Sequence, residues 1–291
     1  MEKHDANRRD GTLWIHRLFA MVMTAGMVGL FVTSANAASL KSETVRAWET
    51  YVKLTEERIA TELDAERGFL AQELLSEQDA VMCHAQVMAG EFCVVKLQTL
   101  DAAGDEIDVP SGMVHHWLGS VFIPGAELEE LLSWVQNYND HEQYFDEVED
   151  SALLAREGNV FDILLRLKRK KVITVHYNTT HRVEYRRHDP SRVSAKSTTT
   201  RIAQLDNPGT PEEREKPVGE DNGFLWRLNS YWRYKQVDGG VIVETESLSL
   251  SRGIPFAVRP FVSPVVNSVP RESMVSTLGS IRRGVVSRPT D

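Results

Sequence analysis

The chain has 291 residues, and its 33 Lys and Arg residues against 42 Asp and Glu residues give a formal net charge of −9 at pH 7. An acidic chain lacks the basic surface that phosphate backbones require, which argues against a nucleic-acid partner. Hydrophobic residues make up 42% of the sequence, enough to fill the core of one substantial domain.

The first 37 residues have the pattern of a secretory signal peptide. Three arginines precede an apolar run over residues 18–32, and Ala-Asn-Ala at residues 35–37 forms a cleavage site. The run has about 15 residues, fewer than the roughly 20 that a membrane-spanning helix needs. We therefore predict cleavage near Ala37 and a periplasmic or secreted protein, with an uncleaved membrane anchor as the alternative.

Residues 38–110 are predicted to form an N-terminal extension that packs on the main domain. A long helix is expected over residues 42–75, although Gly68 weakens it, and a β-hairpin over residues 81–88 and 92–100 follows. The alternative is a coiled coil that binds a partner, but the apolar stripe is too short and irregular for sustained heptads. The stripe consists of Val45, Trp48, Val52, Ile59, Leu63, Leu70 and Leu74.

The chain has two cysteines, Cys83 and Cys93, both in the part predicted to be exported. An oxidising compartment would permit a disulfide bond between them. The expected hairpin places Cys83 opposite Leu97 rather than Cys93, so a disulfide needs another register, and two buried free thiols are the alternative. Neither cysteine is predicted to be catalytic, because no histidine with an orienting residue can be assigned to it.

The second domain, residues 111–291, is predicted to contain one strand, one helix, a long series of strands and a closing helix. The first strand covers residues 115–123 and the first helix residues 126–138. Short turns join most later strands, as antiparallel neighbours require. The closing helix is expected to begin at Pro270. The strands between the two helices are predicted over residues 148–156, 159–168, 172–185, 191–203, 224–237 and 241–252.

This order of elements, over about residues 113–285, resembles the helix-grip fold of the START-like and polyketide cyclase superfamily. The resemblance implies an α+β fold in which a curved antiparallel sheet of about seven strands surrounds the C-terminal helix. It also implies a ligand cavity between the sheet and that helix. Members of the superfamily include lipid carriers, hormone receptors and aromatase or cyclase enzymes, so the fold does not determine the function. No motif allows a catalytic residue of the family to be transferred.

The hairpin over residues 224–252 separates its aromatic from its charged residues. A two-residue turn at Asp238-Gly239 would place Arg233 opposite Glu244 and Trp232 opposite Thr245, with the aromatic face inward. We then expect Arg233 and Glu244 to form a solvent-exposed ion pair. The alternative is that Glu244 and Glu246 serve as a general acid and base, because carboxylates on one face can differ in pKa.

We predict the wall of the cavity from the apolar positions that face the closing helix. A close-packed core at the same positions is the alternative. No catalytic residue is predicted. The wall is expected to comprise Trp117, Ile163, Leu165, Val175, Tyr177, Trp226, Leu228, Trp232, Tyr234, Met274 and Leu278, with His116 and Thr245 as polar members.

No metal or other cofactor is predicted, although the chain has nine histidines. The adjacent His115 and His116 must point to opposite faces of a strand, so they cannot easily share an ion. His176 is expected to face outward beside Arg166. No HExxH motif or paired cysteine spacing is present.

Two long segments lack a clear pattern. Residues 204–223 are rich in Pro, Gly and acidic residues, and are expected to be disordered or to form a lid. Residues 253–269 contain three prolines, which argue against a membrane-spanning helix there. That second segment is expected to cover one end of the cavity, with transient contact to a membrane as the alternative.

The function predicted from these features is an exported binder or carrier of a hydrophobic small molecule or lipid, without catalysis. An enzyme of the cyclase or dehydratase type that uses the same cavity is the first alternative. An envelope assembly protein that binds a partner through the N-terminal helix is the second, and the sequence does not identify that partner.

Overall fold

The computed structural model describes residues 38–65, 68–170, 173–254 and 259–286, and for residues 259–267 it describes the backbone alone. Residues 38–291 form one compact unit. The predicted boundary near residue 110, between the N-terminal extension and the second domain, therefore does not divide this unit in two. The predicted leader, residues 1–37, lies outside the described residues.

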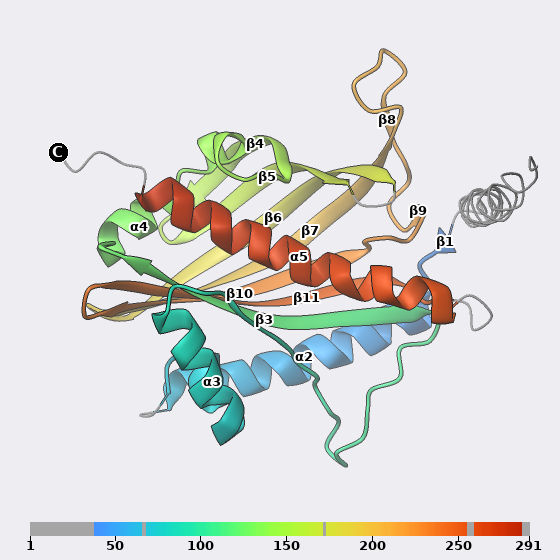
Figure 1. Cartoon of the computed structure of the whole chain (residues 1–291). Coiled ribbons are helices and arrows are strands. Elements are labelled where there is room, and N and C mark those ends of the chain that lie inside the picture. Colours follow the sequence, from blue (N-terminus) through green and yellow to red (C-terminus); the bar gives the residue numbers. More distant parts are fainter. Residues whose placement is uncertain (1–37, 66–67, 171–172, 255–258, 287–291) are drawn as a thin grey trace, which may run out of the picture. The chain divides into compact units, whose positions relative to one another are not determined.

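A nine-stranded antiparallel sheet is the centre of the molecule (Figure 1). Its strands follow the order β2-β3-β11-β10-β7-β6-β5-β4, and the short β8 pairs with β7. A separate pair is formed by β1 (Ala38–Ser39) and β9 (Glu220–Asp221). The strands of the main sheet are β2 (Cys93–Lys96), β3 (Gly112–Pro124), β4 (Val148–Glu157), β5 (Val160–Lys170), β6 (Thr174–Asp189), β7 (Arg192–Asp206), β8 (Arg214–Glu215), β10 (Arg227–Val237) and β11 (Gly240–Arg252).

Helices lie on both faces of this sheet (Figure 1). One face meets the C-terminal helix, and we call it the α5 face; the opposite face meets the long N-terminal helix, and we call it the α2 face. This is the predicted helix-grip arrangement, with α2 on the outside. The helices are α2 (Ser42–Asp64), η1 (Ala71–Leu74), α3 (Glu77–Met88), α4 (Leu128–Val135), η2 (Tyr138–Gln143) and α5 (Arg259–Val286).

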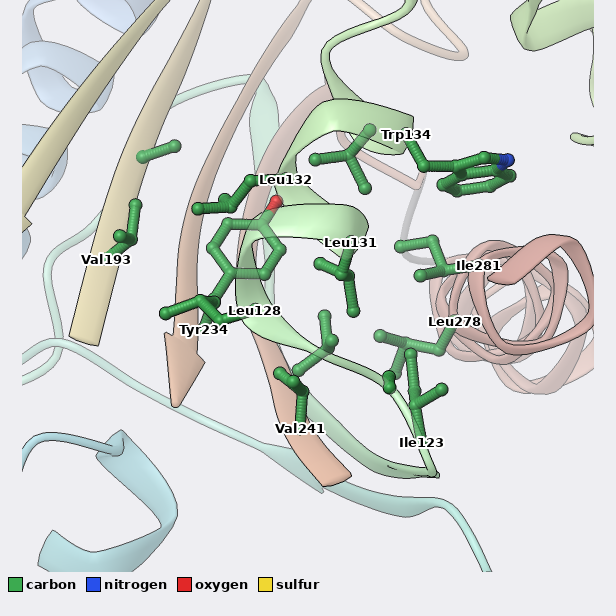
Figure 2. Close-up of a cluster of buried hydrophobic side chains, with 14 of the residues drawn as sticks. Ile123, Leu128, Leu131, Leu132, Trp134, Val193, Tyr234, Val241, Leu278 and Ile281 are labelled. Carbon is green, nitrogen blue, oxygen red and sulfur yellow. The ribbon is translucent and has the colours of Figure 1, made fainter. Parts of the chain in front are cut away.

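The main hydrophobic core fills one end of the space between the α5 face and α5 (Figure 2). In α4, Leu128, Leu131, Leu132 and Val135 share one face, and all four are buried. Burial of each such side chain contributes roughly 1.5–3 kcal/mol to folding. Tyr234 of β10 packs in the same cluster.

α5 approaches the sheet most closely at β3. A Cβ atom built on Gly119 would lie 2.3 Å from the Met274 sulfur and 3.0 Å from Leu278 Cδ1. A Cβ atom on Gly284 would lie 2.1 Å from the Trp134 ring. Both glycines therefore allow α5 to pack directly on β3 and α4, where a side chain would separate the elements.

The N-terminal extension differs from the prediction in two places. The predicted helix over residues 42–75 ends at Asp64, and Gly68 adopts a positive φ of 76° in the turn that follows. The predicted hairpin strand over residues 81–88 is wrong, because these residues belong to α3. Ser76 caps that helix by accepting a hydrogen bond from the Asp79 N–H at 3.3 Å, which the hydrophobic pattern alone did not reveal.

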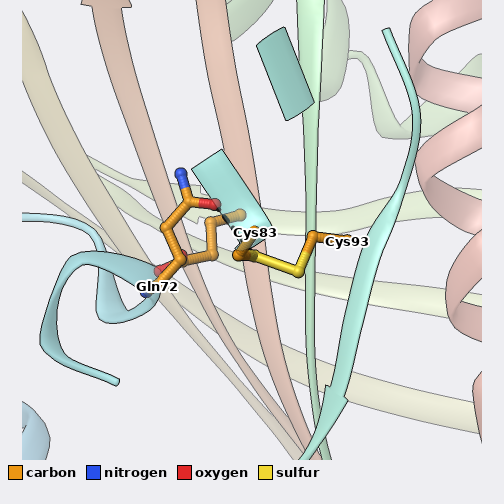
Figure 3. The surroundings of a disulfide bond; sticks show 4 residues. Gln72, Cys83 and Cys93 are labelled. Atoms are coloured by element: carbon orange, nitrogen blue, oxygen red, sulfur yellow. Dashed lines mark hydrogen bonds between the residues drawn. A yellow bond between two sulfur atoms is a disulfide. The ribbon is translucent and has the colours of Figure 1, made fainter. Parts of the chain in front are cut away.

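A disulfide bond joins α3 to the sheet (Figure 3). Cys83 of α3 and Cys93 of β2 are bonded, with their Cα atoms 5.2 Å apart. β2 pairs with β3 rather than with residues 81–88, so the register that argued against the bond does not exist. Gln72 Oε1 lies 3.2 Å from the Cys83 sulfur.

The two long segments are also more ordered than expected. Within residues 204–223, β8 pairs with β7 and β9 pairs with β1, so the expectation of disorder is wrong. The helix α5 begins at Arg259, before the predicted start at Pro270. Pro260 lies in the first turn, where the backbone N–H has no helical partner, and the helix continues through Pro264 and Pro270.

None of the helices in the described part of the chain has the length and apolar character needed to span a membrane.

Candidate functional site

The middle of the α5 face carries no charged side chain on β3, β5, β6, β7, β10 and β11. The pairing registers show which residues of each strand lie on this face. On β5 they are the alternate residues from Phe161 to Leu167, and on β3 the alternate residues from Met113 to Ile123. Acidic and basic side chains of the same strands lie mainly on the α2 face, as Arg182 and Glu184 do on β6. A ligand in the middle of the α5 face would therefore meet only apolar and neutral polar groups of these six strands.

The charged residues of this face stand at its margins, with Lys96 of β2 opposite Trp117 and Arg156 of β4 opposite Phe161. Arg169, at the end of β5, forms ion pairs with Glu147 and with Glu272 of α5. Arg187, near the end of β6, donates to Glu129 of α4. Arg169 and Arg187 therefore have carboxylate partners of their own outside the middle of the face.

Two rows of side chains cross the middle of the α5 face. One row runs Tyr185, Ala195, Trp232, Thr245 and Gly119, through β6, β7, β10, β11 and β3. The next row runs Val183, Ser197, Ser230, Ser247 and Trp117 through the same strands.

Solvent reaches the middle of this face. Trp232 lies on the central strand β10, yet its side chain is only half-buried, whereas Tyr234 two residues away is fully buried in the core. Ser197, Ser230 and Ser247 are also half-buried. A close-packed core would bury all four, so the described side chains do not completely fill the space between α5 and this part of the sheet.

The side chain of Thr245 ends in a buried hydroxyl group. The residue is 3% exposed, and its Oγ1 atom has no hydrogen-bond partner within the described part of the protein. Thr245 lies on the α5 face between Trp232 and Gly119. A buried hydroxyl without a partner destabilises the folded protein, so a bound molecule that satisfied it would gain affinity.

Two histidines on the α5 face are neutral at pH 7. Burial lowers the pKa of His115 to about 4 and that of His181 to about 4. The Thr179 hydroxyl donates its one proton to the Leu165 carbonyl at 2.9 Å. In its contact with His181 Nε2, also at 2.9 Å, Thr179 Oγ1 must therefore accept, and Nε2 must donate. Ser197 can then donate to His181 Nδ1 at 3.4 Å. His181 is thus held as the neutral Nε2–H tautomer.

Most of the predicted cavity residues do lie on the α5 face or on α5. Trp117, Leu165 and Trp232 are half-buried at the edge of the main core, and Ile163, Tyr234, Met274 and Leu278 are buried within it. Tyr177 is buried, and its hydroxyl has no partner in the described residues. Val175 and Leu228 are half-buried, and the registers place both on the α5 face.

The prediction for Trp226 is wrong. The chain turns at Gly223, which has a φ of 71°, and β10 begins only at Arg227. The alternation of β10 therefore does not extend to residue 226. Trp226 packs with Trp48 and Tyr51 of α2 and donates its indole N–H to Asp221 at 3.1 Å.

The prediction for His116 is also wrong, because this histidine lies on the α2 face. Its Nδ1 atom is 3.0 Å from the Tyr51 hydroxyl, and its Nε2 atom is 2.6 Å from Glu246 Oε1. Arg58 of α2 donates to the same Glu246 oxygen. Thr245, the other predicted polar residue, does lie on the α5 face.

Arg233 and Glu244 are paired in the predicted register, but the expectation that they face solvent is wrong. Arg233 is 2% exposed and donates to Glu62 of α2 at 2.5 Å and to the Phe69 carbonyl at 3.0 Å. Glu244 is 1% exposed and accepts from the N–H groups of Ala71 and Gln72, at 2.6 and 2.9 Å. The sequence did not reveal that α2 and η1 cover this face.

The α2-face carboxylates do not form an acid and base open to a substrate. Burial raises the pKa of Glu244 to about 7, while the His116 and Arg58 hydrogen bonds and charges hold the pKa of Glu246 below its usual range. Although the two pKa values differ, both carboxylates are enclosed by α2, η1 and the sheet. Their contacts join the helix to the sheet.

Within the described residues, no group of three or more His, Cys, Asp or Glu side chains is arranged to hold a metal ion. His176 faces outward and contacts Glu149 at 2.7 Å, which in turn binds Arg166, as the alternation predicted.

No protein-family model matches the chain, and no curated protein matches its sequence. Several solved structures are similar to it. A protein of Thermus thermophilus shares 16% identity over 58% of this chain and 96% of its own, with a TM-score of 0.42. A STAR-related lipid transfer protein of Xanthomonas axonopodis shares 15% identity over 62% and 96%, with a TM-score of 0.44. The Zhui aromatase/cyclase of a Streptomyces species shares 12% identity over 60% and 96%, with a TM-score of 0.40.

At these identities the likeness concerns the fold, and lipid transfer and cyclisation are properties named for the other proteins. The helix-grip assignment rests on the elements of this chain: a strand, a helix, six further strands of one antiparallel sheet, and a C-terminal helix packed on the sheet's first long strand.

Proposed function

We propose that this protein is exported and binds a hydrophobic small molecule or lipid between α5 and the sheet, without transforming it. The observation that supports binding most directly is the half-buried Trp232. It occupies the central strand of the sheet, on the face that α5 covers, where a protein without a ligand site would be closely packed.

The distribution of charge supports binding without catalysis. Acid and base catalysis in such a site would require a titratable group near the ligand with a pKa near neutrality. The two histidines of the α5 face have pKa values of about 4, and the middle of that face holds no charged side chain of the sheet. The carboxyl group with a pKa of about 7, Glu244, is enclosed under α2.

The structure gives no support to the alternative of partner binding through the N-terminal helix. Trp48, Tyr51 and Ile59 form the apolar stripe of α2, and all three are buried against the sheet. None of the large exposed hydrophobic residues found in the described part of the chain belongs to α2. An interface with a partner would instead require an exposed stripe.

Native mass spectrometry of the full chain, purified from its own host under mild conditions, tests the proposal. We expect a co-purified molecule that is released when the protein unfolds. In Ser230→Phe, the new ring would occupy the α5 face between Ser197 and Ser247 and next to Trp232 on the same strand, and the bound mass should be lost. Thr180→Phe places the same ring on the opposite face of β6 and should retain it. Wild-type protein without any bound mass, and without affinity for added apolar ligands, would contradict the proposal.

A further inference from the structure

The segment that begins at Ala38 is held in place by β9. Ala38 of β1 pairs with Asp221 in antiparallel register. The pairing continues at Leu40, whose N–H donates to the Gly219 carbonyl at 2.8 Å. Ala38 and Leu40 also pack against the hydrophobic cluster between α2 and the sheet. The backbone nitrogen of Ala38 is therefore held at a defined position beside β9.

Side chains alternate along this pair of strands. Ala38 is half-buried and Asp221 is 2% exposed, so both face the interior of the protein. Ser39 and Glu220, the neighbouring pair, are exposed. Asp221 is thus the carboxyl group of β9 that shares a face with Ala38, whereas Glu220 lies on the other face.

The Asp221 carboxyl group holds the turn that leads into β10. Its Oδ1 atom accepts from the Gly223 N–H at 2.6 Å and from the Trp226 indole N–H at 3.1 Å. Burial raises the pKa of Asp221, and the charge of Lys216 acts in the opposite direction. Lys216 Nζ is itself 3.0 Å from Asp206. A further cation close to Asp221 would stabilise the ionised carboxylate.

The cleavage predicted after Ala37 would change the chemistry of position 38. A leader peptidase hydrolyses the Ala37–Ala38 bond with one water molecule. The new carboxyl group stays on Ala37 and leaves with the leader, and the new amino group on Ala38 takes up a proton. Paired residues of antiparallel strands have Cα atoms about 4.5–5.5 Å apart. The ammonium group would therefore form beside Asp221, within the range over which opposite charges favour each other's ionised form.

We infer that removal of the leader creates an ion pair between the α-ammonium group of Ala38 and the buried carboxylate of Asp221. The inference rests on the proposed export and on cleavage after Ala37. Through Asp221, the pair connects the first residue of the mature chain to Gly223 and Trp226. Processing thus stabilises the folded protein, because an amide nitrogen at position 38 carries no charge.

The stability of the exported protein tests the inference. The chain is purified after export from its own host, and N-terminal sequencing establishes that it begins at Ala38. Asp221→Asn keeps the oxygen that accepts the two hydrogen bonds and removes the charge. We expect the melting temperature at pH 7 to fall by at least about 3 °C. Without the ion pair, a neutral amide in this buried position would leave the melting temperature unchanged or raise it.

Glu220→Gln is the matched control for Asp221→Asn. It removes the same charge from the neighbouring residue of β9, but Glu220 is exposed and pairs with Ser39. The melting temperature of this variant should equal that of the wild type.

The reactivity of the α-amino group provides a second measurement. An amine-reactive ester is added at pH 7, and mass spectrometry of the N-terminal peptide measures the rate of acylation. The ion pair keeps the amine protonated, so the wild type should react at least about fivefold more slowly than Asp221→Asn, and Glu220→Gln should match the wild type. Lys216 and Tyr177 are the other titratable groups that interact with Asp221, and they are the same in all three proteins.

The inference stays testable if Asp221→Asn does not fold. The dependence of the acylation rate on pH gives the pKa of the Ala38 amine in the wild type. That pKa should be higher in the folded protein than in urea, because the nearby carboxylate favours the ammonium form. Burial of the amine without an ion pair would lower it instead.

The outcomes separate this inference from the function on which it rests. An unchanged or higher melting temperature in Asp221→Asn, or equal acylation rates in the wild type and that variant, would overturn the ion pair and leave export and ligand binding standing. A protein that keeps its leader, or that begins elsewhere than at Ala38, would overturn the ion pair together with the predicted cleavage.

Discussion

Arg233 and Glu244 face each other across β10 and β11, and both are buried beneath α2 and η1. The Arg233 Nε atom is 3.9 Å from Glu244 Oε1, so their contact is electrostatic rather than a hydrogen bond. Each has its stronger bonds elsewhere: Arg233 to Glu62 of α2, and Glu244 to the backbone of η1. The pair thus connects the sheet to two separate parts of the N-terminal extension.

The first prediction concerns the pH dependence of stability. The pKa of Glu244 in the folded protein is raised by burial to about 7, against 4.5 for an exposed glutamate. The folded state therefore binds a proton more tightly than the unfolded state, so this group's contribution to stability is present at low pH and is lost as the pH rises from about 4.5 to about 7. The loss amounts to roughly 3 kcal/mol once Glu244 is ionised.

Glu244→Gln removes the titration. The free energy of unfolding of the variant, relative to that of the wild type, should rise by roughly 2 to 3 kcal/mol between pH 5 and pH 8. The exposed Glu184→Gln should show no such change. Urea denaturation at several pH values measures the difference. A relative stability that does not depend on pH would mean that Glu244 stays ionised in the folded protein, held by Arg233 and the η1 N–H groups.

The second prediction concerns Arg233 itself. Arg233→Met keeps most of the side-chain volume but leaves Glu62 and Glu244 without their guanidinium partner. Removing one member of a buried ion network typically costs about 3 to 5 kcal/mol, because the remaining charge is buried without compensation. The double variant Arg233→Met with Glu244→Gln should be more stable than the sum of the single effects implies. Urea unfolding of the four proteins measures this coupling, and additive effects in the double-mutant cycle would show that the two residues do not interact.

The third prediction concerns the disulfide bond. Cys83 and Cys93 are separated by 10 residues and are both buried. A cross-link that closes so short a loop stabilises the folded state by about 3 kcal/mol in the chain-entropy model. Replacing both cysteines with alanine should reduce the free energy of unfolding by about that amount. A reducing agent should lower the stability of the wild type in the same way and leave the double variant unchanged; wild-type stability that is insensitive to reduction would contradict the prediction.

Pairing within the β-hairpin could be predicted from sequence, but burial could not. The two-residue turn and the alternation of apolar residues place Tyr231 opposite Glu246 and Trp232 opposite Thr245, and the structure has these pairs. The charged face was expected to meet solvent because sequence alternation does not show what covers a sheet. Leu248 and Leu250 share the face of Glu244 and Glu246, and these leucines were the available signal that the face is buried.

The N-terminal extension and the start of α5 were missed for different reasons. Residues 81–88 are rich enough in apolar side chains to suggest a strand, but the cap formed by Ser76 and Asp79 indicates a helix, and α3 is that helix. Pro260 and Pro264 were placed in a segment without a clear pattern, and Pro270 was taken to mark the start of the closing helix. One missing N–H falls in the first turn, where it has no helical partner, and the helix continues through the other two prolines.

The last prediction compares two aromatic residues on the same face of β10. Trp232 and Tyr234 stack with their rings nearly parallel, at an interplanar angle of 7° and a centroid distance of 6.2 Å. Tyr234 is buried in the main core among Val193, Val243 and the residues of α4, whereas Trp232 is half-buried at its edge. The two positions therefore differ in packing although they share one strand, one face and an aromatic side chain.

Tyr234→Ala should empty a close-packed position and cost about 3 to 5 kcal/mol of unfolding free energy. Trp232→Ala should cost less than about 2 kcal/mol, because part of its side chain already faces an unfilled space and the substitution only enlarges it. The same variant should lose affinity for uncharged apolar ligands such as 1-monooleoylglycerol, since Trp232 would supply much of the apolar contact. Thermal and urea unfolding measure stability, and competition with a fluorescent acylglycerol measures binding. Equal destabilisation by the two substitutions, together with unchanged binding in Trp232→Ala, would show that Trp232 belongs to a filled core and that the ligand site lies elsewhere.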